Sequence, residues 1–334
     1  MDSFFDRRLW LNLVKDRSMP ISIADVRDAH TRIKPYIHCT PMLQSSQLNK
    51  LLGCELVFKA DNMQKVGAFK ARGACNAVFS MDQDSLNKGV VTHSSGNHGA
   101  ALAWAAAMRK TPCTVVMPNN APQAKKDAVI SYGATVVYCE PTMTAREATV
   151  ASLMDKHNAR LIHPYDDDLI IAGQGTAALE TLSQIPQPID ILMAPVGGGG
   201  LLGGSALVVK QSSGFDTIQV IGAEPEMAND AWQGFKSGVR VAQFVPKTIA
   251  DGLRGTLGVR NFEIITEHVD DILLTSEARI VEAMKLIWSR LKIIVEPSAA
   301  VPVAAIMDQP EQFKGKRIAI ILSGGNLDLD DLPW

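Results

Sequence analysis

Short apolar runs alternate with amphipathic segments along most of the chain, and this alternation predicts its architecture. Strands are expected at the apolar runs, and helices where apolar residues recur every three or four positions. The predicted strands lie at 56–59, 90–92, 113–117, 134–139, 189–196, 217–223 and 316–322. The predicted helices lie at 22–34, 72–80, 100–108, 123–131, 144–157, 172–183, 201–211 and 280–291. Such alternation forms βαβ units, so we expect an α/β fold with parallel sheets.

Composition and charge narrow the class of protein. The chain has 334 residues, of which 46% are hydrophobic and 20% charged, and its formal net charge is −2. These values are typical of a soluble globular protein and give no electrostatic reason to expect a nucleic acid or membrane partner. No run approaches the roughly 18 apolar residues of a membrane span. The five cysteines are scattered without a C-x-x-C pair, which favours reduced thiols in the cytoplasm.

The segment 67–74, with the sequence GAFKARGA, carries the first candidate for chemistry. Lys70 lies between two glycines and follows Phe69. In a tight, dry pocket the lysine would lose its charge more easily, and a neutral amine is a nucleophile toward an aldehyde. The alternative is an ordinary surface lysine at the start of a helix.

A run of four glycines gives the strongest local signal. Gly197, Gly198, Gly199 and Gly200 follow an apolar strand and open a helix. Consecutive backbone N–H groups at a helix start can converge on a phosphate. The run matches neither a Walker loop nor the dinucleotide pattern G-x-G-x-x-G. The alternative is a tightly packed turn.

Two further segments follow predicted strands. Ser94, Ser95, Asn97 and His98 precede a helix, where they suit a small substrate carboxylate. Ordinary capping of that helix is the alternative. Ser323 follows the last strand and offers a neutral hydroxyl. Four features therefore lie at strand ends: a lysine, a candidate phosphate site, a candidate carboxylate site and a neutral hydroxyl. Together they indicate pyridoxal phosphate acting on an amino acid.

These motifs resemble those of the fold type II pyridoxal-phosphate enzymes, in particular the branch of serine racemases and serine/threonine dehydratases. The resemblance runs from about residue 21 to 329 and includes 170–176 (IIAGQGT) and 249–253 (IADGL). It implies two parallel-sheet α/β domains with the site in the cleft between them. The larger, cofactor-binding domain would comprise 19–85 and 161–334, and the smaller one 86–160. Residues 1–18 would be a poorly ordered or loosely docked leader.

The resemblance also assigns roles to single residues. Lys70 would hold the cofactor covalently and act as a base. The remaining cofactor contacts it implies are Phe69 beside the ring, Asn97 at the 3′ oxygen, Gly197 to Gly200 at the phosphate and Ser323 at the pyridine nitrogen. The serine and asparagine segment would bind the substrate, through Ser94, Ser95, Asn97 and His98.

Ser95 bears on the reaction that the family resemblance implies. In serine racemases a serine here is the second acid/base, whereas many threonine dehydratases have alanine. We therefore expect a serine racemase that also eliminates water from serine or threonine, giving a 2-oxo acid and ammonia. A serine/threonine or β-hydroxyaspartate ammonia-lyase without significant racemase activity is the alternative.

The family also implies a metal, a dimer and, in animals, ATP. Glu224, Ala228 and Asp230 resemble the segment that binds a divalent metal, with oxygen ligands that suit Mg²⁺ (or Ca²⁺ or Mn²⁺). A solvated acidic turn is the alternative. Val66 and Ala100 replace residues of the animal ATP site, which puts activation by ATP in doubt. A homodimer is implied as well.

Two other classes of function compete with this interpretation. A regulatory amino-acid sensor could keep an α/β fold without any cofactor. A nicotinamide dehydrogenase would require a G-x-G-x-x-G motif with an acidic residue about 20 positions later, and the sequence lacks it.

Overall fold

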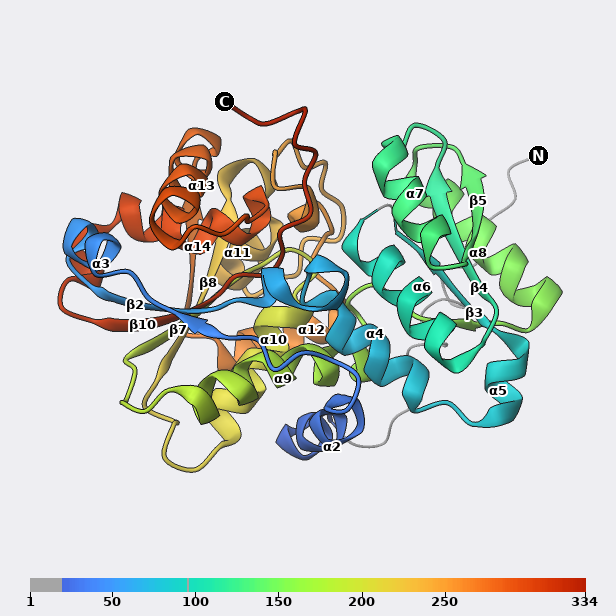
Figure 1. Cartoon of the computed structure of the whole chain (residues 1–334), viewed down its shortest axis with the longest axis horizontal. Coiled ribbons are helices and arrows are strands. Elements are labelled where there is room, and N and C mark those ends of the chain that lie inside the picture. Colours follow the sequence, from blue (N-terminus) through green and yellow to red (C-terminus); the bar gives the residue numbers. More distant parts are fainter. Residues whose placement is uncertain (1–19, 95) are drawn as a thin grey trace.

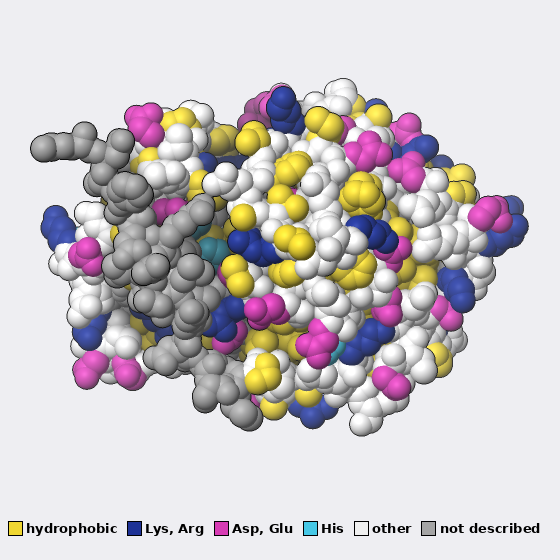
Figure 2. Space-filling model, turned by 180° about the vertical axis from the view of Figure 1, so that it is seen from behind, with side chains coloured by type: hydrophobic (Ala, Val, Ile, Leu, Met, Phe, Trp, Pro, Cys, Tyr) yellow, Lys and Arg dark blue, Asp and Glu magenta, His cyan; other side chains and the backbone are white. Residues whose placement is uncertain are grey.

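The computed structural model describes residues 20–94 and 96–334, which form two β-sheets covered by helices on both faces (Figure 1). The expected leader, residues 1–18, and Ser95 lie outside the described residues, so the expectations for them stay predictions. Within the described part, no helix combines the length and the apolar character needed to cross a lipid bilayer. On the face drawn in Figure 2, acidic and basic side chains are intermixed among hydrophobic ones.

The larger sheet has six strands in the order β1-β2-β10-β7-β8-β9. They are β1 (Met42–Leu43), β2 (Glu55–Lys59), β10 (Arg317–Ile321), β7 (Ile191–Pro195), β8 (Gln219–Pro225) and β9 (Asp271–Thr275). All neighbours are parallel except β1, which pairs antiparallel with β2 at the edge. The last strand of the chain, β10, therefore lies in the interior of the sheet, between β2 and β7.

The smaller sheet has four parallel strands in the order β5-β4-β3-β6. They are β5 (Thr135–Cys139), β4 (Cys113–Pro118), β3 (Val90–His93) and β6 (Arg160–Leu161). Two sheets of parallel strands confirm the predicted fold class.

Helices cover both faces of each sheet. One face of the larger sheet packs against α3 (Ser46–Leu52), α13 (Glu277–Leu291) and α14 (Pro297–Asp308), with α15 (Pro310–Phe313) beside them. The other packs against α2 (Ile23–Ile33), α9 (Asp168–Gln184), α10 (Gly200–Gln211), α11 (Asp230–Ser237) and α12 (Val259–His268). The smaller sheet lies between α8 (Met143–His157) on one face and α6 (Asn97–Arg109) and α7 (Gln123–Ser131) on the other.

Helix α4 (Lys70–Phe79) joins the two sheets, because it packs against α9 and α6 (Figure 1). After it comes α5 (Gln83–Lys88), and the short 3₁₀ turns are η1 (Asp61–Met63), η2 (Lys65–Gly67), η3 (Glu226–Ala228) and η4 (Asp251–Leu253). The sequence placed the start of this helix at residue 72, two positions after its observed start. Since α4 contributes to the core of the smaller sheet, the proposed boundary between the two domains stays a prediction.

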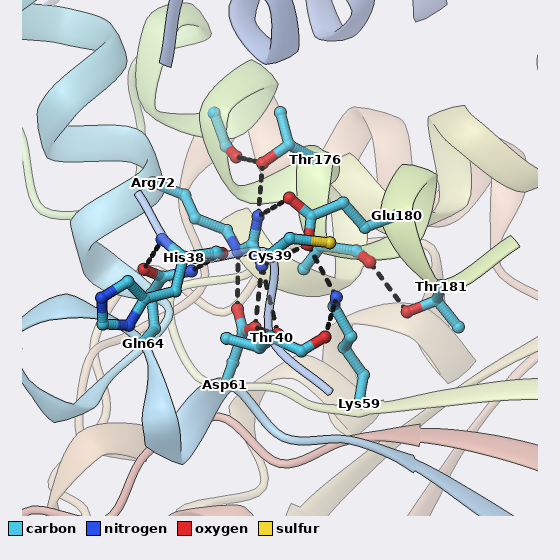
Figure 3. Close-up of polar contacts among 12 residues, drawn as sticks. His38, Cys39, Thr40, Lys59, Asp61, Gln64, Arg72, Thr176, Glu180 and Thr181 are labelled. Atoms are coloured by element: carbon cyan, nitrogen blue, oxygen red, sulfur yellow. Dashed lines mark hydrogen bonds and ion pairs between the residues drawn. The ribbon is translucent and has the colours of Figure 1, made fainter. Parts of the chain in front are cut away.

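A cluster of buried charges fixes α4 in place (Figure 3). Arg72 is fully buried and donates from Nε and Nη2 to the Asp61 carboxylate at 2.7 and 2.9 Å. It also donates from Nη1 and Nη2 to the Glu180 carboxylate, at 2.9 Å each. Burial alone would raise the pKa of Asp61, but the charge and hydrogen bonds of Arg72 lower it below its usual value. Both acids are therefore ionised and paired.

Lys59 adds a second cation to this cluster. Its Nζ donates to Glu180 at 2.6 Å, to the Gln184 side chain at 2.7 Å and to the Thr40 carbonyl at 2.8 Å. The Thr40 hydroxyl donates to Asp61 at 2.7 Å. Two cations thus face two carboxylates, and the Thr40 carbonyl and the Gln184 side-chain oxygen accept the remaining hydrogen bonds of Lys59.

Replacement of Arg72 tests how far the fold depends on this cluster. Arg72→Met leaves two buried carboxylates with one cation, so we expect the free energy of unfolding to fall by about 3–5 kcal/mol. Denaturant unfolding of the cofactor-free protein measures it. The control Arg27→Met changes an exposed arginine of α2 and should stay within about 0.5 kcal/mol. A loss for Arg72→Met as small as that of the control would contradict the assigned role.

Candidate active site

The segment before Lys70 is joined to the end of β10. Ala68 forms a β-bridge with Gly324, and the Phe69 N–H donates to the Ser323 carbonyl at 2.9 Å. The Gly325 N–H donates to the Gly67 carbonyl at 3.0 Å. These contacts place Lys70 beside Ser323, although the two residues are far apart in the sequence. The two residues were expected to contact the same cofactor.

Lys70 has the environment expected of a reactive amine. Its Nζ donates to the Pro164 carbonyl at 2.8 Å and lies 5.0 Å from the centre of the Phe69 ring. Burial lowers the pKa of Lys70 to about 8, and the negative charge of Glu296 opposes that shift. Because the pKa lies within reach of neutral pH, a useful fraction of this amine carries no charge.

Buried His98 and half-buried His163 lie near Lys70, buried His93 packs against His163, and all three are neutral. Burial, with the charge of Lys70 as a further cause, lowers the pKa of His163 to about 3 and that of His98 well below its usual value. Burial and His163 lower the pKa of His93 to about 3. The Nε2 atom of His98 lies 3.2 Å from the Ile162 carbonyl oxygen. The side chain of His98 therefore carries no positive charge toward a substrate carboxylate.

The four glycines follow β7 and run into the first turn of α10, and side chains and backbone from other segments pack tightly against them. A Cβ atom on Gly198 would lie 2.2 Å from the Tyr165 ring, and one on Gly197 would lie 2.8 Å from the Leu253 backbone. Gly199 has a φ of +96°, a left-handed conformation that favours glycine. The loop leads directly into the first turn of α10, whose N–H groups lack partners within the helix. The glycine loop can therefore be both a tightly packed turn and a phosphate-binding site.

The serine and asparagine segment lies between β3 and α6. The Ser94 hydroxyl accepts from the Gly96 N–H at 3.3 Å, and Asn97 is the first residue of α6. The Asn97 amide donates to both oxygens of Glu296 at 3.0 Å. This contact joins α6, which packs on the smaller sheet, to the segment before α14, which packs on the larger sheet. Ser95 is not among the described residues, so its role stays a prediction.

Comparison with known proteins identifies the family. The model of the pyridoxal-phosphate dependent enzymes matches residues 33–324. The chain belongs to this family. It is 49% identical over 310 residues to a β-hydroxyaspartate dehydratase of Paracoccus denitrificans, covering 93% of this chain and 98% of that protein. It is 48% identical over 318 residues to a serine racemase of Dictyostelium discoideum, covering 93% and 97%. The crystal structure of the Dictyostelium discoideum serine racemase superposes with a TM-score of 0.87 at 47% identity, covering 92% of this chain and 99% of that one.

The residues of this pyridoxal-phosphate enzyme fit its cofactor. Ser323 is 2% exposed, and its hydroxyl has no hydrogen-bond partner in the described part of the chain. A buried hydroxyl without a partner costs free energy unless a ligand supplies one. Together with the Lys70 amine, whose pKa is lowered to about 8, and the glycine loop, it forms a set of groups suited to an aldehyde, a ring nitrogen and a phosphate.

Two acids of the predicted metal segment are buried side by side in the same enzyme. Both oxygens of Glu224 accept backbone N–H groups, from Ala231 at 3.1 Å and Trp232 at 2.8 Å. Burial and the charge of Asp230 raise the pKa of Glu224 well above its usual value, and burial raises that of Asp230 to about 6. In the described residues no three His, Cys, Asp or Glu side chains gather as a metal site. Further ligands would have to be backbone carbonyls or water.

Sequence reasoning missed Glu296, which is buried and contacts Asn97 of this enzyme's expected cofactor site. It precedes a helix that is apolar on all sides, and a single acid in such a position carries no periodic signal. The sequence Glu-Pro-Ser resembles an ordinary helix start, because proline favours the first turn.

Gly198 offers a test of the loop geometry. Gly198→Ala should lower the free energy of unfolding by about 1–3 kcal/mol, since the new methyl group would overlap the ring of Tyr165. In a Tyr165→Ala background the same change should cost little. Denaturant unfolding of the four cofactor-free proteins measures both costs. Equal costs in the two backgrounds would exclude the ring as the cause.

Proposed function

We propose that this enzyme is a serine racemase, which interconverts L- and D-serine and also eliminates water from serine or threonine to give a 2-oxo acid and ammonia. The observation that carries the proposal is 48% identity to a serine racemase across nearly the whole of both chains. The same name belongs to relatives from plants and mammals at 41–47% identity.

Lys70 is the proposed base on one face of the substrate. Pyridoxal phosphate, when bound, supplies an aldehyde for condensation with amines and a conjugated ring that acidifies the Cα–H of an amino acid. When its Nζ atom is free, Lys70 would be able to accept the Cα proton, because burial lowers its pKa to about 8. Its hydrogen bond to the Pro164 carbonyl directs the amine.

The surrounding residues are proposed to hold the cofactor. The N–H groups of Gly197 to Gly200 would bind the phosphate, while Phe69 packs beside the ring. The Asn97 amide would contact the 3′ oxygen. Ser323 offers the pyridine nitrogen a neutral hydroxyl rather than a carboxylate, so it does not stabilise a protonated ring.

Racemisation requires a second group, on the opposite face, that returns a proton to Cα. Ser95 is the proposed group, because a serine hydroxyl can both donate and accept a proton. Elimination needs only the base and a proton for the leaving hydroxyl. Ser94, Asn97 and His98 would bind the substrate carboxylate, with His98 acting through its backbone N–H because its ring is neutral.

A second candidate is a β-hydroxyaspartate dehydratase without significant racemase activity. The relative of that name is 49% identical, and the match covers 98% of it. The two functions share the base and the elimination step, and they differ in whether a proton returns to Cα.

Product analysis separates the two candidates. With L-serine we expect both D-serine and pyruvate, measured in one sample by chiral chromatography and a coupled assay. In Ser95→Ala, D-serine formation should fall at least 100-fold while pyruvate formation is partly retained, since general acid–base groups contribute about 10²–10⁴-fold.

A control variant and two further outcomes complete this test. Lys70→Ala should abolish both products and the visible absorbance of the bound cofactor. Pyruvate without D-serine in the unmodified enzyme would contradict the racemase proposal. In that case faster turnover of β-hydroxyaspartate than of serine would support the dehydratase.

We also propose that Glu224, Asp230 and the Ala228 carbonyl hold Mg²⁺, with Ca²⁺ or Mn²⁺ as substitutes. Burial raises the cost of ionising both carboxyl groups, and the charge of Asp230 adds to that cost for Glu224, so a cation would stabilise the ionised pair. Oxygen ligands suit these hard metals.

The metal should stabilise the protein most at high pH. The folded-state pKa values of both acids are raised, so their ionisation removes stability from the metal-free protein as pH rises from about 4 through 6. A cation offsets that loss, and at a hundredfold excess over its dissociation constant it adds about 2.7 kcal/mol. We expect thermal unfolding after EDTA treatment to show a larger Mg²⁺ shift at pH 8 than at pH 5.

Matched variants identify the acids that bind the metal. Glu224→Gln should lose the Mg²⁺ response, whereas Glu226→Gln, an exposed acid of the same segment, should keep it. No Mg²⁺ shift at either pH would rule out the metal site.

The remaining proposals rest on the family. A homodimer in the cytoplasm suits its resemblance to serine racemases. Activation by ATP stays in doubt, because Val66 and Ala100 stand where the animal enzymes have a threonine and a glutamine.

A further inference from the structure

Glu296 is a buried acid that accepts hydrogen bonds from two nitrogen atoms. It is 3% exposed and directly precedes α14. The Asn97 amide nitrogen donates to Oε1 and to Oε2 at 3.0 Å each, and the Asn326 N–H donates to Oε2 at 3.1 Å. Asn97 comes from the smaller sheet and Asn326 from the end of the larger one. The carboxylate therefore joins the two halves of the expected cofactor site.

The chemistry of these contacts requires an ionised carboxylate. Both nitrogen groups that hydrogen-bond to the Glu296 side chain are donors, and an ionised carboxylate offers acceptors only. A protonated acid, or an amide in its place, would point a hydrogen at one of these donors. The positive end of α14 also favours a negative charge at this position.

The other end of the Asn97 amide is fixed as well. Its Oδ1 accepts from the Asn326 side-chain nitrogen at 2.9 Å, and the same nitrogen donates to the Val66 carbonyl at 2.7 Å. Rotation of the Asn97 amide by half a turn would break contacts at both ends. Asn97 therefore has one orientation, set by Glu296 and Asn326.

We propose that Glu296 is a positioning residue: its ionised carboxylate holds the Asn97 amide in the one orientation in which it can contact the cofactor. The inference rests on the proposed role of Asn97 at the 3′ oxygen. Cofactor affinity, the quantity it concerns, does not depend on which products the enzyme forms.

The charges around Glu296 link this role to pH. Burial, followed by the charge of Asp251 in η4, raises the pKa of Glu296 to about 7. Lys125 of α7 pairs with Asp251 and lowers the pKa of Glu296, and Lys70 of α4 also faces it. Because the raised pKa lies near neutrality, Glu296 takes up a proton as pH falls below about 7, and its hold on Asn97 weakens.

Cofactor titration tests the inference. Pyridoxal phosphate is added to cofactor-free enzyme between pH 5.5 and 8.5, and the dissociation constant is read from protein fluorescence. Glu296→Gln should weaken binding about 10- to 100-fold at pH 8, as expected for loss of hydrogen bonds to a charged group. Wild type should lose affinity below pH 7 more steeply than the variant. The cofactor phosphate titrates in both proteins, so only the difference between them reports on Glu296.

A matched control separates positioning from a general effect of removing an acid. Glu277 lies at the start of the neighbouring helix α13 and accepts the Ile249 N–H at 2.8 Å. Glu277→Gln should leave the dissociation constant and its pH dependence unchanged. A folded Glu296→Gln protein with wild-type affinity and wild-type pH dependence would overturn the proposal.

An exchange of the two groups keeps the inference testable if Glu296→Gln folds poorly. Asn97→Asp places two carboxylates face to face and should lower the Tm of the cofactor-free protein. The double variant Asn97→Asp/Glu296→Gln restores a donor opposite an acceptor and should recover at least half of that loss. Its cofactor affinity should stay low, because the donor of Asn97 is gone. Additive losses of Tm would show that the contact does not matter.

Discussion

The contact on which the site depends most is the clamp of Arg72 between Asp61 and Glu180. Arg72 lies in the first turn of α4, two positions after Lys70. Its guanidinium therefore fixes the rotation of this helix about its axis and its position along that axis, and with them the place of the lysine. Asp61 belongs to the turn after β2, and Glu180 to α9, which packs on the larger sheet. An apolar side chain could fill the same volume, but it would not define the rotation of the helix through five directed N–H donors.

Polar contacts also connect the two sheets. Asn97 of α6 contacts Glu296 before α14, and Lys125 of α7 pairs with Asp251 of η4. Both contacts are polar and directional, whereas the cores beneath them are apolar and belong mainly to one sheet or the other. The energy of each half therefore comes from its own core. The relative position of the halves depends on α4, which packs against α9 and α6, and on these polar contacts, which lie around the place where chemistry is proposed to occur.

The sequence allowed the architecture to be predicted because parallel strands are buried on both faces and form short apolar runs. The run at 189–196 contains β7, and the run at 316–322 contains β10. Helix α14 was not predicted, since it is buried on all sides and so has no amphipathic period, and since Pro302 within it reads as a helix breaker in the sequence. Lys70 and Ser323 could be singled out from local motifs. Asp61, Glu180 and Glu296 could not, because each acquires its role from partners that only the fold brings close.

The position of β10 has a consequence for how the enzyme is made. This strand pairs with β2 and β7 in the interior of the larger sheet, and the loop after it bridges to Ala68. During synthesis, which adds about 5–20 residues per second, the lysine segment leaves the ribosome long before its bridging partner exists. The smaller sheet, whose strands all lie between residues 90 and 161, can form earlier. Capture of the cofactor therefore belongs to the completed chain, and a chain cut short before its last strand lacks the sheet interior and the site together.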